Sequence, residues 1–221
     1  MEAKTLAVIG GTGAEGGGLA LRWAHAGHRV IIGSRQAEKA KAGAEALNAL
    51  LGRSAIEGMD SEAAAKACDI AVLTVPYAAQ KTTALALAPA LKGKILVDVT
   101  VPLCPPKVST VQLPPSASCV VDLQAELGDE VKVVSAFQNV SAHKLKNLDY
   151  EIECDVLVCS NDKEARQVVI QLARDVGLRG IDAGGLANST VAESLTSVLI
   201  WINKTYKIPD AGIVITGLPA A

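Results

Sequence analysis

The sequence has few aromatic residues, almost no net charge and no long apolar run. Phe, Trp and Tyr make up only 3% of its 221 residues, so we expect an aliphatic core and no stacking platform for single-stranded nucleic acid. A formal charge of −2 provides no basic surface for a phosphate backbone, so no nucleic-acid partner is expected. No apolar run approaches the roughly 18 residues of a membrane span, so no membrane partner is expected. Half of the residues are hydrophobic, which excludes a disordered chain.

Signs of secretion are also missing. The N-terminus has neither the basic start nor the small-residue cleavage site of a signal peptide. The cysteines form no C-x-x-C pair, and an odd, scattered set is typical of buried thiols in a reduced compartment. We therefore predict a cytoplasmic protein with free cysteines. They are Cys68, Cys104, Cys119, Cys154 and Cys159.

Short continuous apolar runs alternate with helical patterns through the first 140 residues. The runs begin at Leu6, Val30, Ile70 and Ile95, and their continuity is typical of strands covered on both faces. This alternation predicts an α/β fold with a parallel sheet. Helices are expected between the runs at residues 19–26, 37–51, 62–67 (with Ser61 as N-cap) and 78–91.

The rest of the chain is expected to begin with a loop. Residues 101–115 are proline-rich and follow a predicted parallel strand, at the sheet edge where α/β proteins bind ligands. A helix over 117–127, a strand over 131–137 and a strand over 156–159 are expected next. Two amphipathic helices follow, the first capped by Asp162 and ended by Gly177. Their apolar stripes, expected in the core or in a dimer contact, are Ala165, Val168, Val169, Leu172 and Val176, and Val191, Leu195, Val198, Leu199 and Ile202.

The segment after the first strand contains G-x-G-x-x-G at Gly11, Gly13 and Gly16. A strand before it and a helix after it are the context of the dinucleotide-binding fingerprint. Gly11 permits the tight turn, Gly13 lets a pyrophosphate approach the backbone, and Gly16 lets the helix pack against the strand. The amides and dipole of the helix N-terminus favour an anion. An ordinary glycine-rich turn is the alternative.

The residues at the end of the second strand predict which cofactor binds. NAD-binding folds place an acidic residue there, whereas this sequence has Ser34 and Arg35, with Lys39 one helical turn later. A hydroxyl, a guanidinium and an ammonium bind a 2′-phosphate that a carboxylate would repel. A solvated helix start is the alternative, but helix N-termini disfavour cations. We therefore predict NADP(H).

These observations predict a Rossmann-type doubly wound parallel sheet with a small C-terminal α-rich subdomain. Residues 1–140 are expected to form the NADP-binding domain. Residues 141–221 are expected to form the small C-terminal domain.

The sequence offers no convincing acid, base or metal site beside this cofactor. Tyr77 and Lys81 match the Y-x-x-x-K of short-chain dehydrogenases, but they lie too early in the chain and the glycine spacing differs. The three histidines form no metal-spaced cluster, and G-x-S-x-G is absent. Hydride transfer between two ring cofactors needs only that their faces are held together. We therefore assign no catalytic side chain and no metal, and expect residues 101–115 and 137–140 to form walls.

Several segments resemble the coenzyme F420-dependent NADP oxidoreductase family and cover nearly the whole chain in order. They are residues 10–13, 33–35 with Lys39, 67–76, 132–136, 182–184, 188–189 and 193–195. The resemblance implies hydride transfer between NADP(H) and coenzyme F420. It also implies a homodimer whose C-terminal domain helps to cover the deazaflavin.

The resemblance further implies which residues bind the cofactors. The pyrophosphate would be held by Thr12, Gly13, Ala14 and Glu15, the 2′-phosphate by Ser34, Arg35 and Lys39, and the nicotinamide side would be lined by Thr74, Val75, Pro76 and Ala136. Gln138 stands where the family carries a histidine, and residues 102–115 also depart from the family's pattern. Both departures lie where the second cofactor is expected.

Two other functions stay open at this point. The same NADPH site could pass electrons to a flavin or to a ferric or cupric centre, as in the reductase domains of metalloreductases, which resemble the same family. The chain could also be a non-catalytic NADP-binding redox sensor. Turnover discriminates the two, because a sensor binds NADPH without oxidising it.

Overall fold

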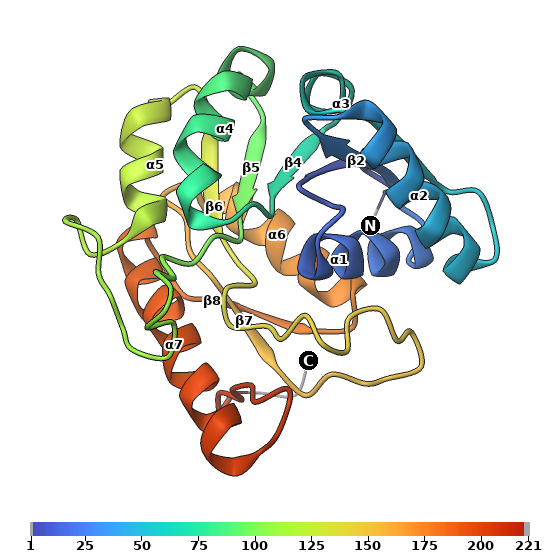
Figure 1. Cartoon of the computed structure of the whole chain (residues 1–221). Helices are drawn as coiled ribbons and strands as arrows, with labels where there is room; N and C mark the ends of the chain where they lie inside the picture. Colours follow the sequence, from blue (N-terminus) through green and yellow to red (C-terminus); the bar gives the residue numbers. More distant parts are fainter. Residues whose placement is uncertain (1, 219–221) are drawn as a thin grey trace.

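The computed structural model in Figure 1 describes residues 2–218 and centres on one parallel sheet. Its strands are β1 (Thr5–Ile9), β2 (Arg29–Ser34), β3 (Ile56–Asp60), β4 (Ile70–Leu73), β5 (Ile95–Asp98) and β6 (Lys132–Ser135). They pair in the order β3-β2-β1-β4-β5-β6, and every pairing is parallel. This is the Rossmann strand order, and the order of the strands reverses between β1 and β4: β2 and β3 lie on one side of β1, and β4, β5 and β6 lie on the other. The predicted fold class is confirmed.

Helices cover both faces of this sheet, as a doubly wound fold requires. They are α1 (Ala14–His25), α2 (Ala37–Leu51), α3 (Ser61–Ala67), α4 (Tyr77–Leu91), α5 (Cys119–Leu127) and α6 (Lys163–Asp175). Residues of α1, α2 and α6 share one apolar cluster with the strands, and residues of α3, α4 and α5 share another. Because alternate strand residues belong to opposite clusters, the strands read as continuous apolar runs.

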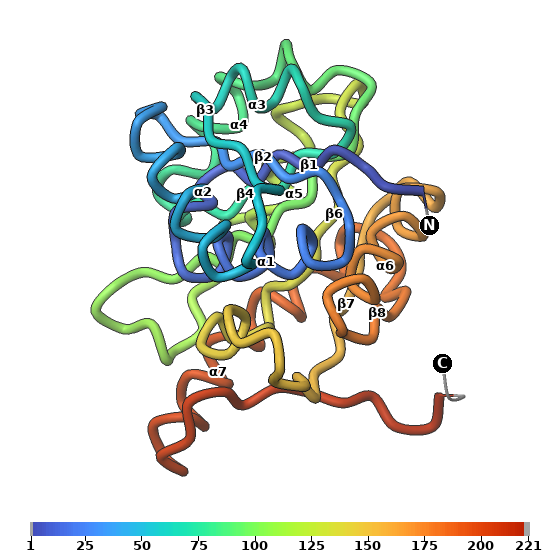
Figure 2. The backbone as a smooth tube through the Cα atoms, turned by 90° about the vertical axis from the view of Figure 1, so that its right-hand side faces the viewer, coloured from blue at the N-terminus to red at the C-terminus, as the bar shows by residue number. Residues whose placement is uncertain are grey.

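The C-terminal part adds a second, two-stranded parallel sheet and a long helix. Its elements are β7 (Asp155–Val158), β8 (Arg179–Asp182), the 3-10 turn η1 (Leu186–Asn188) and α7 (Ser189–Tyr206). An antiparallel bridge between Ser135 and Cys159 links β6 to β7. Figure 2 shows α7 and the chain after it lying along one side of the molecule, away from α3 and β3.

Side chains of α1 hold the C-terminal part against the sheet. The indole nitrogen of Trp23 donates to the carbonyl of Leu172 in α6 at 2.9 Å, and the Trp23 ring meets Phe137 edge-on. The buried guanidinium of Arg22 donates to four carbonyl oxygens of the loop between β6 and β7 and of the end of α6. Those carbonyls belong to Leu145, Asn147, Tyr150 and Val176.

Three of the expected element boundaries were wrong. Helix α1 begins at Ala14 rather than residue 19, so the glycines after the loop are helical. The N-cap of α3 is Asp60, whose side chain accepts from the Ala63 amide, and not Ser61. Helix α5 begins at Cys119 because Ala117 has a φ of 70°, which a helix does not allow, and Ser118 is the cap.

The predicted stripes on α6 and α7 differ in their surroundings. On α6, Asp162 caps the helix as expected and most of the stripe is buried. On α7, Leu199 is buried, whereas Val191 and Val198 are 62% and 44% exposed.

All five cysteines are free, as predicted. Among the residues that the structure describes, no helix is both long and apolar enough to cross a membrane.

Candidate functional site

A cavity of about 840 Å³ opens at the carboxyl ends of the parallel strands. The loops after β1, β2, β4 and β5 all contribute to its lining, as do residues after β6 and one residue of α7. Ligands of open α/β sheets bind at this edge, where the strand order reverses. Of the predicted site residues, Thr12, Gly13, Ala14, Glu15, Ser34, Arg35, Thr74, Val75, Pro76 and Gln138 line the cavity.

Three predicted residues lie outside this lining. Gly11 packs beneath the loop, where a Cβ would lie 2.9 Å from the Val8 carbonyl oxygen and 3.2 Å from Ile32. Ala136 is fully buried in the core. Lys39 is exposed on α2, one turn beyond Arg35.

The glycines of the loop after β1 have two different roles. The fold requires glycine at some of these positions, whereas at one position the missing side chain leaves space in the cavity. Gly10 has a φ of +86°, a conformation that L-residues rarely adopt, and a Cβ at Gly16 would overlap Thr74. A Cβ at Gly13 would meet only the Gly10 carbonyl oxygen, at an ordinary 3.4 Å. The fold therefore does not require glycine at position 13, and its missing side chain leaves room on the cavity side for a ligand.

The N-terminus of α1 points its first amides toward this space. Gly13 is the N-cap, and no side chain caps the helix. The first amides of a helix have no intrahelical acceptor, and the helix dipole adds a partial positive charge there. Such an end binds the diphosphate of a dinucleotide without further basic side chains.

Ser34 and Arg35 lie at the end of β2, on the adenosine side expected from the fold. Both line the cavity, and no carboxylate replaces them there. Within residues 2–218, neither Arg35 nor Lys39 forms an ion pair, and the nearby Glu38 pairs with Lys41 at 2.9 Å. The guanidinium of Arg35 is therefore available to a 2′-phosphate.

The carboxyl end of β4 forms the wall beside the helix N-terminus. The Thr74 hydroxyl donates to the Ile9 carbonyl at 3.0 Å, and the Thr74 amide donates to the same oxygen at 2.9 Å. These two bonds hold the strand end against the loop after β1. Val75 and Pro76 then give this side of the cavity an apolar surface, which suits a flat ring.

A hydrogen-bond network beneath the far wall centres on Asp98, the fully buried last residue of β5. Its carboxylate accepts from the Thr100 amide at 2.9 Å and from the Gln80 side chain. Its carbonyl accepts from the Gln138 side-chain amide at 2.7 Å, and the Gln138 carbonyl accepts from the Thr196 hydroxyl. Burial raises the pKa of Asp98 to about 6, although hydrogen bonds from Thr100 and Gln80 lower it.

Glu15 is an acidic residue in the lining of the cavity. Its Oε1 atom is shielded from solvent and has no hydrogen-bond partner among the described residues. Burial raises the pKa of Glu15 to about 8. This carboxyl is therefore mostly protonated at neutral pH, so it adds little negative charge beside a bound diphosphate.

Sequence analysis predicted part of the remaining lining. The loop after β5 was expected to form a wall, and Val101, Leu103, Pro105 and Val108 do line the cavity. Thr100 and Thr196 were not predicted. Thr100 carried a usable signal, because a polar residue just after a buried parallel strand lies at the ligand-binding edge. Thr196 carried none, because only the tertiary fold brings α7 to this edge.

The Y-x-x-x-K pair does not form a catalytic unit. Tyr77 lines the cavity, but burial raises the pKa of its hydroxyl, the opposite of what a proton-accepting phenolate needs. Lys81 forms an ion pair with Glu126 on α5. Within residues 2–218, no group of three or more His, Cys, Asp or Glu side chains could hold a metal ion.

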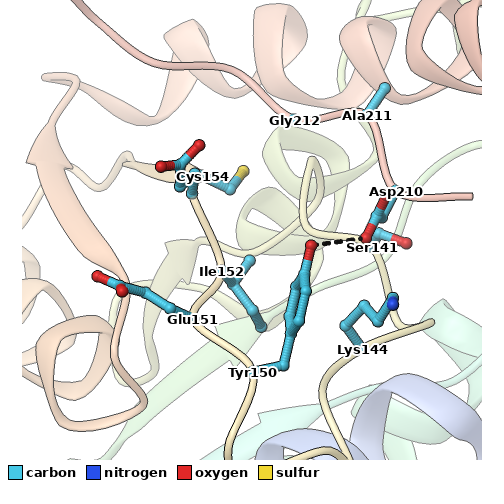
Figure 3. A pocket seen from close by; sticks show the side chains of 10 residues that line it. Ser141, Lys144, Tyr150, Glu151, Ile152, Cys154, Asp210, Ala211 and Gly212 are labelled. Carbon is cyan, nitrogen blue, oxygen red and sulfur yellow. Dashed lines mark hydrogen bonds between the residues drawn. The ribbon is translucent and has the colours of Figure 1, made fainter. Parts of the chain in front are cut away.

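A second cavity, of about 240 Å³, lies elsewhere, between the loop before β7 and the chain after α7 (Figure 3). The Tyr150 hydroxyl donates to Asp210 at 3.2 Å across it, and the Lys144 ammonium lies 4.6 Å from the centre of the Tyr150 ring. These contacts join the C-terminal segment to the loop. None of the residues predicted to bind a cofactor lines this cavity.

Comparison with known proteins matches this chain over nearly its whole length. A sequence model described as "NADP oxidoreductase coenzyme F420-dependent" matches residues 5–102. The chain is 42% identical to the F420-dependent NADP reductase of Methanocaldococcus jannaschii, over 96% of this chain and 98% of that protein. It is 39% identical to the F420-dependent NADP reductase of Methanothermobacter thermautotrophicus, over 97% of this chain and 95% of that protein.

The fold is also similar to that of known dehydrogenases. The structure of a GDP-mannose dehydrogenase from Pseudomonas aeruginosa aligns with a TM-score of 0.68 at 16% identity. The alignment covers 91% of this chain and 50% of that one. At this identity the likeness shows the fold alone.

Proposed function

Because this chain belongs to the F420-dependent NADP reductase family, we propose that it transfers a hydride between NADP(H) and coenzyme F420. The observation that carries this conclusion is the cavity at the carboxyl ends of β1, β2, β4 and β5. It joins a phosphate-binding helix N-terminus to an apolar wall for a ring. Its volume of about 840 Å³ lies toward the upper end of the range for ligand pockets, as a site for large ring cofactors requires.

The residues present fit NADP(H). The amides at the start of α1 would hold the diphosphate in the space that Gly13 leaves open. Ser34 and Arg35 would hold the 2′-phosphate, and we propose that Lys39 reaches the same phosphate from the surface of α2. Thr74, Val75 and Pro76 would lie along the nicotinamide, while Gly11 and Ala136 support the site from below without touching the cofactor.

The protein's task in this reaction is positioning. When bound, the two rings supply the redox chemistry: NADPH is oxidised, the deazaflavin is reduced by two electrons, and one proton comes from water. The apolar residues that follow β4, and those of the loop after β5, would hold the ring faces together and exclude water. Thr196 lines the cavity from α7, which supports the proposal that the C-terminal domain, residues 141–221, covers the second cofactor.

A parallel assay of acceptors tests this function. Purified protein is mixed with NADPH and, in separate wells, with oxidised F420, FMN or a ferric chelate. We expect rapid bleaching of F420 alone. Reduction of FMN or iron in place of F420 would move the protein to another acceptor, and binding of NADPH without any turnover would favour a redox sensor.

We propose that the chain forms a homodimer through the outer face of α7. Val191, Val198 and Trp201 lie on this face and are 62%, 44% and 60% exposed, which is unusual for three large apolar residues of one helix. Light scattering of the wild type and of Trp201→Lys would test the dimer.

A cytoplasmic location is proposed from the five free thiols, which fit a reducing compartment.

A further inference from the structure

Ser61 lines the cavity, although the sequence suggested a different role for it. Its hydroxyl was expected to cap α3, but the N-cap is Asp60, whose carboxylate accepts from the Ala63 amide at 2.9 Å. Ser61 is the first residue of the helix and belongs to the cavity lining, whereas Asp60 does not. The fold therefore does not need the Ser61 hydroxyl as a cap, and this hydroxyl can serve a ligand.

The pairing of β2 with β3 places Ser61 beside Arg35. The two strands are parallel, and Ser34 is in register with Asp60. The next residues of the two chains, Arg35 and Ser61, therefore leave the sheet next to each other at its carboxyl edge. A Cβ at Gly33 would lie 3.3 Å from the Ser61 Cα, so Ser61 also approaches the end of β2 closely. Ser34, Arg35 and Ser61 all line the cavity.

The charges around this position favour an anion. Within the described part of the chain, the cavity lining holds one basic side chain, Arg35, and one acidic side chain, Glu15. Glu15 belongs to α1, and not to the ends of β2 and β3. The carboxylate of Asp60 is held at the start of α3. A ligand beside Ser61 would therefore meet a guanidinium and hydroxyls.

A phosphate monoester matches this set of donors. Its three terminal oxygens are strong acceptors, and a guanidinium can bind two of them through its fork. The hydroxyls at the ends of β2 and β3, from Ser34 and Ser61, can donate as well. We propose that Ser61 is a further specificity-determining residue, which donates a hydrogen bond to the 2′-phosphate of NADP(H). This inference rests on the proposed function, which assigns that phosphate to Ser34 and Arg35.

Such a contact distinguishes NADP(H) from NAD(H). NAD(H) carries a hydroxyl in place of the 2′-phosphate, so a hydrogen bond to the phosphate contributes nothing to its binding. A carboxylate at position 61 would repel the phosphate, as the acidic residue at the end of β2 does in NAD-binding folds. Ser61→Ala should therefore remove the contact, and Ser61→Asp should replace it with a repulsion.

Equilibrium affinities of variants at position 61 test the proposal. The Kd of each protein is measured for NADP+ and NAD+, and for adenosine 2′-monophosphate and adenosine 5′-monophosphate, which lack the nicotinamide. Ser61→Thr keeps the hydroxyl. Ser54→Ala and Ser54→Asp are the matched controls, because Ser54 is exposed and precedes β3, at the opposite end of that strand.

We expect Ser61→Ala to bind NADP+ and adenosine 2′-monophosphate about tenfold more weakly, the loss of one hydrogen bond to a charged group. Ser61→Asp should bind both about thirtyfold more weakly or worse, because like charges then face each other. Both variants should bind NAD+ and adenosine 5′-monophosphate as the wild type does. Ser61→Thr and the two Ser54 variants should stay close to the wild type for all four ligands.

Two results would overturn the inference. One is wild-type affinity of Ser61→Ala for NADP+, and the other is an equal loss for NADP+ and NAD+. Thermal unfolding without ligand gives a further readout. Because Asp60 caps α3, the Tm of Ser61→Ala should stay within about two degrees of the wild type. A larger fall would show that the hydroxyl serves the fold and would contradict the proposal.

The wild-type protein separates this inference from the proposed function. Equal Kd values of the wild type for NADP+ and NAD+ would contradict the proposed NADP(H) specificity, and the role of Ser61 with it. A wild type that prefers NADP+, together with a Ser61→Ala variant that keeps the whole preference, would leave the proposed function standing and overturn only the role of Ser61.

Discussion

The carboxylate of Glu193 accepts a hydrogen bond of 2.8 Å from the backbone amide of Cys119, so a residue of α7 satisfies the N-terminus of α5. Glu193 is 1% exposed and also accepts from the Ser118 hydroxyl. The negative charge lies at the positive end of the helix dipole, which favours it. This contact ties the C-terminal helix to the sheet domain beside the cavity.

Removal of this carboxylate should destabilise the protein. Glu193→Ala leaves a buried amide and a buried hydroxyl without their acceptor, so we expect a loss of about 2–4 kcal/mol in the free energy of unfolding. Glu193→Gln keeps one acceptor oxygen and should lose about half as much. Urea unfolding measures both, with the exposed Glu126→Gln as control. A loss below about 0.5 kcal/mol for Glu193→Ala would contradict this account.

The guanidinium of Arg35 should decide between the two nicotinamide cofactors. It has no ion-pair partner within the described residues, and a charged hydrogen bond to phosphate contributes about 2 kcal/mol. We therefore expect Arg35→Ala to weaken NADPH binding about 30-fold and NADH binding hardly at all. Lys39→Ala should have a smaller effect, because Lys39 does not line the cavity. Fluorescence titrations with both cofactors check this, and equal losses for NADPH and NADH would exclude the 2′-phosphate site.

The outline of the fold was predictable because its signals are local. Continuous apolar runs mark the strands of a sheet covered on both faces, and the glycine loop between β1 and α1 marks the proposed phosphate site. The features that sequence missed depend on tertiary contacts. Helix α1 begins at Ala14 through residues of low helix propensity, because Gly18 packs against Leu145, which comes from a distant loop. Strand β8 has no apolar run, and its Gly180 fits against the backbone of Ile170 in α6.

The candidate site was predictable to a similar degree. Its charged and glycine positions carry recognisable chemistry in the sequence. The Asp98 network does not, because nothing in the sequence shows that Asp98 is fully buried or that Gln138, forty residues later, lies against it. Likewise, Lys39 has the right charge and spacing, but its side chain lies outside the cavity.

Glu15 should make stability depend on pH. Its pKa in the folded protein is raised by burial from the ordinary 4.5 to about 8, so the folded state holds this proton more tightly than the unfolded state. Its contribution to stability is therefore complete below pH 4.5 and is lost as the pH rises through 8. Glu15→Gln cannot titrate, so it should match the wild type near pH 5 and have the higher Tm at pH 9. Thermal unfolding at both values, with the exposed Glu45→Gln as control, measures this difference, and parallel pH curves would refute it.

Alanine at two glycines of the same loop should separate binding from folding. At Gly13 the backbone φ of −74° suits alanine, and the new Cβ meets only the Gly10 carbonyl oxygen at 3.4 Å, so the fold should tolerate the change. The same methyl group lies on the cavity side, so we expect the affinity for NADP+ to fall at least about tenfold while the Tm stays within a few degrees.

At Gly16 the order of effects should reverse. A Cβ there would overlap the Thr74 side chain, whose hydroxyl is held by the Ile9 carbonyl, so it cannot move aside without breaking that bond. We expect Gly16→Ala to lower the free energy of unfolding by about 1–3 kcal/mol. Binding would then weaken only because less protein is folded, or because α1 has shifted. Urea unfolding and NADP+ titration of both variants give four values. A Gly13→Ala protein that unfolds early, or that binds NADP+ normally, would contradict the diphosphate site at the start of α1.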